Sequence, residues 1–219
     1  MADKTIEICT AMFDFDSDER ISPTQFRGFM AHLFSNISEF HHHSDNNYHY
    51  PLIQYKRVQN KIAIIGIGNY ADIVSSNMAD IEHITTETQK IPIKNIQINN
   101  SVYSIVEKLS TYGFSAPWIA LNEENYAKYK QASKSDKRKL LEKILVGNIL
   151  SMFKGLGIFV PQKIEVNILR HYSKPITVHD NKFVGFGLDF ACNVVLPEYV
   201  GLGKSVSKGF GVIKKKNVS

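Results

Sequence analysis

The hydrophobic positions of the first hundred residues follow first the period of a strand and then that of a helix. Residues 5–12 alternate apolar side chains with Glu7 and Cys9, which predicts a strand. Residues 22–25 carry a serine, a proline and a glutamine in the order of a helix start, with the serine as N-cap. The apolar face of this predicted helix, which ends near Asn36, consists of Phe26, Phe29, Met30, Leu33 and Phe34.

Two further strands and a second helix complete the pattern of this half. The segments YPLIQYKRV and KIAIIGIG predict a β-hairpin that turns at Gln59 and Asn60. A helix over residues 71–78 follows, and then a polar, β-branched stretch over residues 81–98. The order β-α-β-β-α-β is that of the ferredoxin-like unit, an antiparallel sheet with two helices on one face.

The second half begins near Ser101 without a recognisable linker, and its clearest element is a long helix. Ser135 is the predicted N-cap, and Gly155 stands where a left-handed C-terminal residue is expected. The segments KIEVNILR and FVGFGLDFAC alternate as strands, and GFGVIK predicts a short last strand. The predicted inward residues are Leu140, Leu141, Ile144, Leu145, Ile149, Met152 and Phe153 on the helix, and Ile164, Val166, Ile168, Val184, Phe186, Leu188 and Phe190 on the strands. We therefore predict an α+β protein with two domains, residues 1–100 and 101–219.

The charge of the chain is local. The formal net charge is +5, and the last twenty residues alone supply five lysines and no acid. Such a segment favours an anionic partner (nucleic acid, nucleotide or membrane surface), although a solvated tail is the alternative for Lys214–Lys216. No apolar run reaches the about 18 residues of a membrane span, and the acidic N-terminus lacks the order of a signal peptide, so we expect a cytoplasmic protein. Cys9 and Cys192 are too few for a disulfide framework and are expected to be buried.

Two motifs suggest ligands that their context does not support. DFDSDERISPTQ begins like a calcium loop, but Glu19 stands where the sharp turn needs glycine and Gln25 where a glutamate is needed. IIGIGNYA resembles a dinucleotide fingerprint with Gly66 and Gly68, yet the strand before it pairs as a hairpin and no second parallel unit follows. We expect an acidic turn at the first motif and a tight strand end at the second.

Histidines gather in FHHHSDNNYHY, between the first helix and the second strand. They are His41, His42, His43 and His49. A transition-metal site is one interpretation, but consecutive histidines point in different directions and Asp45 is the only nearby acid. A polar surface loop is a second. Acid–base catalysis is favoured, because RNA cleavage needs one group to take the 2′-hydroxyl proton and another to protonate the 5′-oxygen near neutral pH.

A second unusual segment is GLGKSVSKGFGVIKKK, residues 201–216. Its glycines permit a close approach of the backbone to a ligand, and its lysines and serines donate to phosphates. The spacing differs from that of a P-loop, and an extended RNA backbone suits such a loop better than one triphosphate. A mobile glycine-rich hairpin is the structural alternative.

Together these segments resemble the CRISPR-associated repeat-processing endoribonucleases, members of an RNA-binding superfamily with tandem ferredoxin-like domains. The resemblance rests on the histidines after the first helix and on the C-terminal pattern G-x-G-x(5)-G-x-G. It extends over most of the chain through RGFMAHLF, YPLIQYK, IIGIG, FSAPWIALNEENY, ILVGNILSMFKGLG and LPEYVGLGKSVSKGFGVI. It implies two tandem β-α-β-β-α-β domains with antiparallel sheets.

The resemblance implies an enzyme that cuts precursor CRISPR RNA within each repeat, without a metal or other cofactor. The 2′-hydroxyl attacks and leaves a 2′,3′-cyclic phosphate and a 5′-hydroxyl. The family's catalytic position maps to the histidine run, where we predict His43 as general base or acid, His41 as assistant, and Tyr48 or Tyr50 as helper. Arg27 faces either the RNA or solvent. The predicted contacts to the RNA backbone are Gly201, Gly203, Lys204, Ser205, Lys208, Gly209 and Gly211.

Two other functions stay open at this point. A non-catalytic RNA-binding subunit of a CRISPR ribonucleoprotein would share the fold and the loop, with histidines that take no part. A metal-binding regulator that uses the histidine segment is a more distant third. The expected partners are CRISPR repeat RNA and proteins of the CRISPR effector complex, with no membrane; the oligomeric state is open, and a homodimer is compatible with the sequence.

Overall fold

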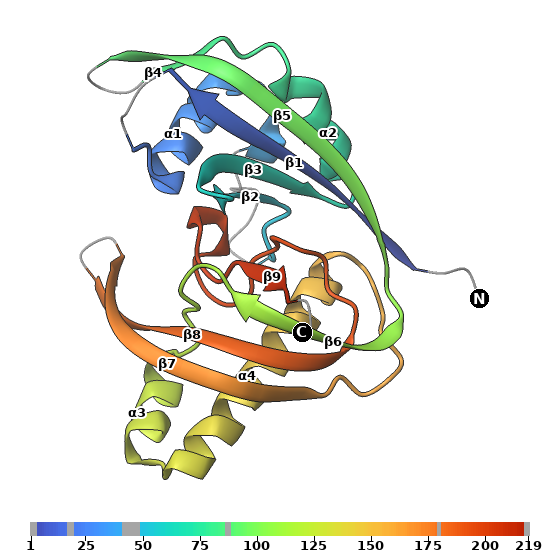
Figure 1. The fold of residues 1–219 in the computed structure, drawn as a ribbon, viewed down its shortest axis with the longest axis vertical. Coiled ribbons are helices and arrows are strands. Elements are labelled where there is room, and N and C mark those ends of the chain that lie inside the picture. Colours follow the sequence, from blue (N-terminus) through green and yellow to red (C-terminus); the bar gives the residue numbers. More distant parts are fainter. Residues whose placement is uncertain (1–3, 17–19, 41–48, 86–88, 179–180, 217–219) are drawn as a thin grey trace. The chain divides into compact units, whose positions relative to one another are not determined.

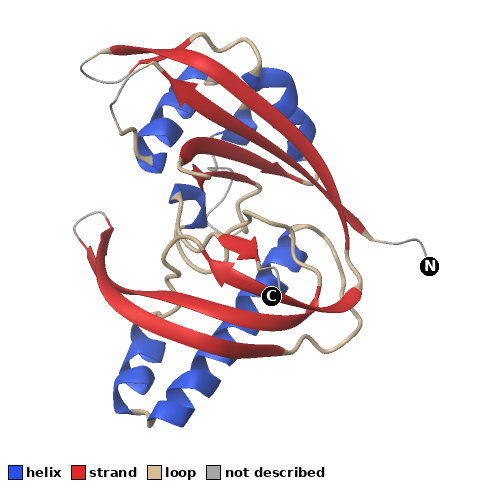
Figure 2. Cartoon of the chain, in the orientation of Figure 1, coloured by secondary structure: helices blue, strands red, loops and turns tan. Residues whose placement is uncertain are grey.

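The computed structural model describes residues 4–16, 20–40, 49–85, 89–178 and 181–216 (Figure 1). The chain divides into two compact units. The N-terminal unit comprises Thr5–Ser104 together with Ser207–Gly209, and the C-terminal unit comprises Lys4, Ile105–Val206 and the described residues from Phe210. Each unit contains one antiparallel sheet, drawn red in Figure 2, and helices, drawn blue.

The sheet of the N-terminal unit has the strand order β2-β3-β1-β5-β4, with antiparallel pairing throughout. Its strands are β1 (Thr5–Phe15), β2 (Ile53–Val58), β3 (Lys61–Ile67), β4 (His83–Thr85) and β5 (Lys90–Ser104). Its helices are α1 (Pro23–Leu33), α2 (Tyr70–Met78) and the 3-10 turn η1 (Ser38–Phe40). Apart from the short β4, this is the predicted ferredoxin-like arrangement.

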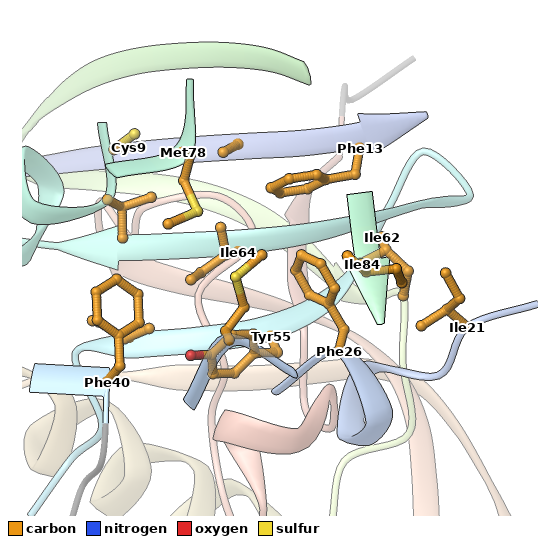
Figure 3. Packing of buried hydrophobic residues seen from close by; sticks show 14 of the residues in the cluster. Cys9, Phe13, Ile21, Phe26, Phe40, Tyr55, Ile62, Ile64, Met78 and Ile84 are labelled. Carbon is orange, nitrogen blue, oxygen red and sulfur yellow. The ribbon is translucent and has the colours of Figure 1, made fainter. Parts of the chain in front are cut away.

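One face of this sheet shares a core with both helices (Figure 3). Alternate residues of β1, namely Cys9, Ala11 and Phe13, point into it, as the period of a strand requires. The ring of Phe26 from α1 meets that of Phe13 edge to face, with centroids 4.8 Å apart. Cys9 and Cys192 are both buried free thiols, as expected, and burial raises the pKa of the Cys9 thiol to about 11.

Local signals in the sequence explain where these elements begin and turn. Ser22 Oγ accepts a hydrogen bond from the Gln25 amide at 3.2 Å, and Gln25 Oε1 accepts one from the Ser22 amide at 2.9 Å, which completes a capping box. Gln59 and Asn60 have φ of +50° and +67°, the left-handed pair of a two-residue hairpin. At Gly66, an added Cβ would lie 2.2 Å from the Tyr70 carbonyl oxygen, so the glycine permits the tight end of β3 against α2.

The sheet of the C-terminal unit has the strand order β7-β8-β6-β9, which corresponds to β2-β3-β1-β5 in the N-terminal unit. The strands are β6 (Glu107–Phe114), β7 (Val166–Val178), β8 (Asn181–Val194) and β9 (Ile213–Lys215), and the helices are α3 (Glu123–Gln131) and α4 (Lys134–Gly155). Between β8 and β9, where the ferredoxin-like unit has its second helix, the described residues form the glycine-rich segment with one 3-10 turn, η2 (Val206–Lys208).

The ends of α4 differ from the prediction. Ser133, not Ser135, is the N-cap, and its Oγ accepts from the Asp136 amide at 3.2 Å. Gly157, not Gly155, is left-handed, with φ of +66°. The amide of Gly157 donates to Lys154 O and that of Ile158 to Phe153 O, the two bonds of a Schellman motif. The helix is therefore two residues longer at its C-terminus than predicted. Gly155 adopts helical geometry, and the left-handed residue that ends the helix is Gly157.

Candidate active site and nucleic-acid interface

The histidine segment is anchored at both ends in the N-terminal unit. Before it, Phe40 is fully buried and its ring stacks on Phe34 with centroids 4.6 Å apart. After it, Tyr50 is buried three residues before β2 begins. The predicted residues that lie outside the described part of the chain are His41, His42, His43 and Tyr48. Of the four predicted catalytic residues His41, His43, Tyr48 and Tyr50, Tyr50 alone therefore lies in the described part of the chain.

Arg27 and Lys208 come together in the same unit. Lys208 lies 181 positions further along the chain, yet residues 207–209 belong to the N-terminal unit with α1. Gly209 has φ of +91°, and a Cβ added there would lie 2.9 Å from Pro23 Cγ, in the first turn of α1. Arg27 follows Pro23 by about one helical turn, which sets it near Lys208.

The electrostatics at this point favour an anion. Burial and, next, the positive charge of Arg27 lower the pKa of Lys208. Two cations held within Coulombic range repel each other, and a phosphate between or beside them relieves that repulsion. The sequence did not decide whether the Arg27 side chain faces RNA or solvent. In the structure Arg27 is half-buried near Lys208.

The rest of the glycine-rich segment belongs to the C-terminal unit, where the backbone is tied to the surrounding chain. The Leu202 amide donates to Gly211 O at 2.9 Å, and the Gly211 amide donates to Pro117 O at 2.9 Å. The Lys204 amide donates to Ile119 O at 3.0 Å, while the Lys204 side chain is exposed. The loop thus presents Lys204 from a backbone that is already hydrogen-bonded.

The glycines of this loop also serve the packing of the protein itself. Gly203 has φ of +94°, and an added Cβ would lie 2.6 Å from Nε1 of the buried Trp118. Gly211 has φ of +62°, and its added Cβ would lie 1.9 Å from a backbone carbonyl oxygen. Gly201 is buried and Ser205 is half-buried with φ of +57°. At Gly203 and Gly211 the approach that needs glycine is to protein atoms, where the sequence suggested a ligand.

Sequence reasoning missed a buried lysine on β2. Lys56 is fully buried, its Nζ donates to Gln54 Oε1 at 2.5 Å, and burial lowers its pKa well below the usual range. The two residues share one face of the strand, and the neighbouring Tyr55 points the other way into the core beneath α1 (Figure 3). The spacing of Gln54 and Lys56 was the available signal, but an alternating polar pair ordinarily predicts a solvated face.

The described part of the chain holds neither a cluster of metal-ligating side chains nor a membrane-spanning helix. In that part of the chain no three or more His, Cys, Asp and Glu side chains gather in a way that could hold a metal ion. The metal alternative for the histidine run itself lies outside the described residues. Among the described helices, none is long and apolar enough to cross a membrane.

Family models match the chain over nearly its whole length. The Cas6b N-terminal domain matches residues 4–104, and the Cas6b C-terminal domain matches residues 104–216. The chain belongs to the Cas6b family. This confirms the resemblance to CRISPR-associated repeat-processing endoribonucleases that the histidine and glycine motifs indicated.

Solved structures of Cas6b proteins confirm the fold. One, described as a crystal structure of Cas6b, superposes with a TM-score of 0.85; another, described as the CRISPR RNA processing endoribonuclease Cas6b, has a TM-score of 0.76. Each is 27% identical and covers 97% of this chain and 100% of the other. An uncharacterized protein of Methanocaldococcus jannaschii is 45% identical over 111 residues, which are 51% of this chain and 76% of that protein.

Proposed function

We propose that this Cas6b protein is an endoribonuclease that cleaves precursor CRISPR RNA within its repeats. The observation that carries the proposal is the match of both Cas6b domains, which together extend over residues 4–216. The similar structure described as a CRISPR RNA processing endoribonuclease, which covers 97% of the chain, supports it. The 2′-hydroxyl of the nucleotide at the cut attacks the adjacent phosphorus, and the products carry a 2′,3′-cyclic phosphate and a 5′-hydroxyl. No metal takes part.

The proposed roles follow from what this reaction needs. One imidazole accepts the 2′-hydroxyl proton and a second group protonates the departing 5′-oxygen; we assign these steps to His43 and His41, with Tyr50 or Tyr48 as helper. Negative charge grows on the phosphorus oxygens in the transition state, and nearby cations stabilise it. The proximity of Arg27 and Lys208 within the unit that holds both ends of the histidine segment supports their assignment to the RNA backbone.

A cleavage assay with repeat RNA in EDTA tests this function. We expect cutting at one position in each repeat, with products that carry the cyclic phosphate. A matched RNA with a 2′-deoxy nucleotide at the cut position should bind equally and stay intact, because its nucleophile is missing. Equal cutting of both RNAs, or activity that appears only when a divalent metal is added, would overturn the proposed chemistry.

A non-catalytic RNA-binding subunit is the alternative, because the cations of the glycine-rich segment do not depend on the histidines. The double substitution Lys204→Ala and Lys208→Ala should weaken RNA binding and make the slope of log affinity against log salt shallower by about 1.4, for two lost phosphate contacts. The control is Lys128→Ala with Lys163→Ala, two exposed lysines paired with Glu124 and Glu165. Binding with this salt dependence but no cleavage of any repeat RNA would favour the alternative.

Protein partners also belong to the proposal. A homodimer and association with proteins of a CRISPR effector complex are compatible with the family. Light scattering on the purified protein, with and without repeat RNA, measures the mass of the assembly and decides the first of these.

A further inference from the structure

The long hairpin of β7 and β8 has two different faces. Phe186, Leu188 and Phe190 on β8 are buried on the helix side, where the Phe186 ring contacts that of Tyr129 from α3. Gly185, Gly187 and Asp189 alternate with them and therefore point to the other face. Cross-strand pairing sets Arg170 opposite Asp189, Tyr172 opposite Gly187, and Lys174 opposite Gly185 on that same face.

Tyr172 presents an aromatic ring on this face. A Cβ added at Gly187 would lie 2.3 Å from Tyr172 Cζ and 2.5 Å from its hydroxyl oxygen, so the ring lies directly over the glycine. Tyr172 is nevertheless 65% exposed. The glycine therefore supports one side of the ring, and the opposite side is open to solvent or a ligand.

The charges around this ring are mainly positive. Asp189 accepts from the Arg170 guanidinium and lies 3.0 Å from Lys216 Nζ. Burial acts to raise the pKa of Asp189, but hydrogen bonds from Lys216 and Arg170 outweigh it and hold the pKa below its usual value. Lys174 is also exposed on this face, beyond Tyr172 on β7, so the face carries three cations and one ionised carboxylate.

We propose that Tyr172 is a stacking platform for one base of single-stranded RNA, with Arg170, Lys174 and Lys216 on the flanking phosphates. An exposed ring on a sheet face among cations has the chemistry that single-stranded nucleic acids require, since every base offers a π-face and every linkage a negative charge. Acidic protein surfaces would match the cations but would not need the open ring. This inference rests on the proposed function only for the identity of the RNA. Tyr172, Arg170 and Lys174 lie outside the glycine-rich segment and the histidine run, while Lys216 is the last residue of the glycine-rich segment.

A purely structural role for Tyr172 is the competing explanation, because an aromatic ring over a strand glycine also stabilises a sheet. The variants Tyr172→Phe, Tyr172→Leu and Tyr172→Ala separate the two roles. Phenylalanine keeps the flat ring, while leucine keeps apolar cover over Gly187 without a π-face. Tyr126→Ala is the matched control, since Tyr126 is a 43% exposed tyrosine on α3.

The test is the affinity of each full-length variant for fluorescein-labelled repeat RNA, measured by anisotropy in EDTA. The RNA carries 2′-deoxy at the cut position, or is unmodified if no cutting occurs. We expect Tyr172→Ala and Tyr172→Leu to bind about 5- to 100-fold more weakly, with Tyr172→Phe and Tyr126→Ala within about twofold of the parent chain. A scan with abasic nucleotides should find one position whose loss weakens the parent chain but not Tyr172→Ala, which identifies the stacked base.

The outcomes distinguish this inference from the proposed function. Cleavage with unchanged affinity in Tyr172→Ala overturns the stacking platform and leaves the endoribonuclease intact. Full affinity in Tyr172→Leu assigns a structural role to the ring and also overturns the platform. Weakened binding with the abasic signature, but no cleavage by the parent chain, supports the platform and rejects the endoribonuclease.

Discussion

At Gly211, both the backbone conformation and the neighbouring atoms require glycine. Its φ of +62° is left-handed, and an added Cβ would lie 1.9 Å from the carbonyl oxygen of Leu202. Gly147, in the middle of α4, is the opposite case, because an added Cβ there meets no atom within 4 Å. The two glycines lie in the same unit, so one can serve as the control for the other.

We predict opposite effects for the alanine variants of these glycines. Gly211→Ala should lower the free energy of unfolding by about 1–3 kcal/mol from backbone strain alone, with the steric clash in addition. Gly147→Ala should raise it by about 0.5–1 kcal/mol, because alanine is the better helix former. Urea denaturation of both variants measures the two changes. A Gly211→Ala protein as stable as the parent chain would show that this loop does not have the described backbone.

Lys56 makes the stability of the protein depend on pH. Its folded-state pKa is lowered by burial, so the unfolded chain binds more protons than the folded one between that lowered value and the usual lysine value of about 10.4. The free energy of unfolding should therefore rise with pH across this window, by up to about 1.4 kcal/mol per pH unit where the states differ by one proton.

The comparison with Lys56→Met isolates this contribution, since methionine does not titrate. We expect the parent chain to gain stability relative to Lys56→Met as the pH rises from about 7 towards about 10. Denaturation curves of both proteins at several pH values give the difference. Parallel curves at every pH would mean that Lys56 keeps an ordinary pKa in the folded state.

At the scale of elements, helix ends need hydrogen bonds that periodicity cannot specify. The sequence around the start of α4 offers two serines, and Ser133 rather than Ser135 caps it. Ser133→Ala should cost about 1 kcal/mol of stability, because it removes an N-cap acceptor. Ser135→Ala, inside the first turn, should leave the stability nearly unchanged or raise it slightly. Thermal unfolding of the two variants measures both changes in stability. A larger loss in Ser135→Ala than in Ser133→Ala would show that Ser135, the N-cap predicted from the sequence, caps the helix.

Elements with strong local signals were predictable, and those defined by distant contacts were not. The capping box of α1 and the turn at Gln59 and Asn60 determine their geometry through neighbouring residues, and both were predicted. The helix α3 was missed, since its apolar pattern is weak and no residue of it is buried. The burial of Lys56 was missed for a related reason. The alternation of Gln54 and Lys56 with apolar residues on β2 resembles that of a solvated face, and tertiary packing buries Lys56.

At the scale of the whole molecule, a short segment near the C-terminus belongs to the N-terminal unit. Ser207–Gly209 belongs with α1, although the residues on both sides belong to the C-terminal unit. The sequence predicted the cations Arg27 and Lys208 separately, but no local rule could predict that they come close together. The packing of Gly209 against Pro23 and the Tyr55 carbonyl oxygen joins residues that are far apart in the chain.

We propose that a histidine of the N-terminal unit performs acid–base catalysis on repeat RNA. Single-turnover cleavage by His43→Ala, at saturating enzyme and in EDTA, tests this role most directly. The matched control is His83→Ala, because β4 lies at the opposite edge of the sheet from β2, the strand that follows the histidine segment. We expect His43→Ala to cut at least tenfold more slowly, since general acid–base groups contribute factors of about 10²–10⁴, and His83→Ala to cut at the parent rate. An undiminished rate in His43→Ala, and equally in the corresponding His41→Ala and His42→Ala proteins, would contradict the claim.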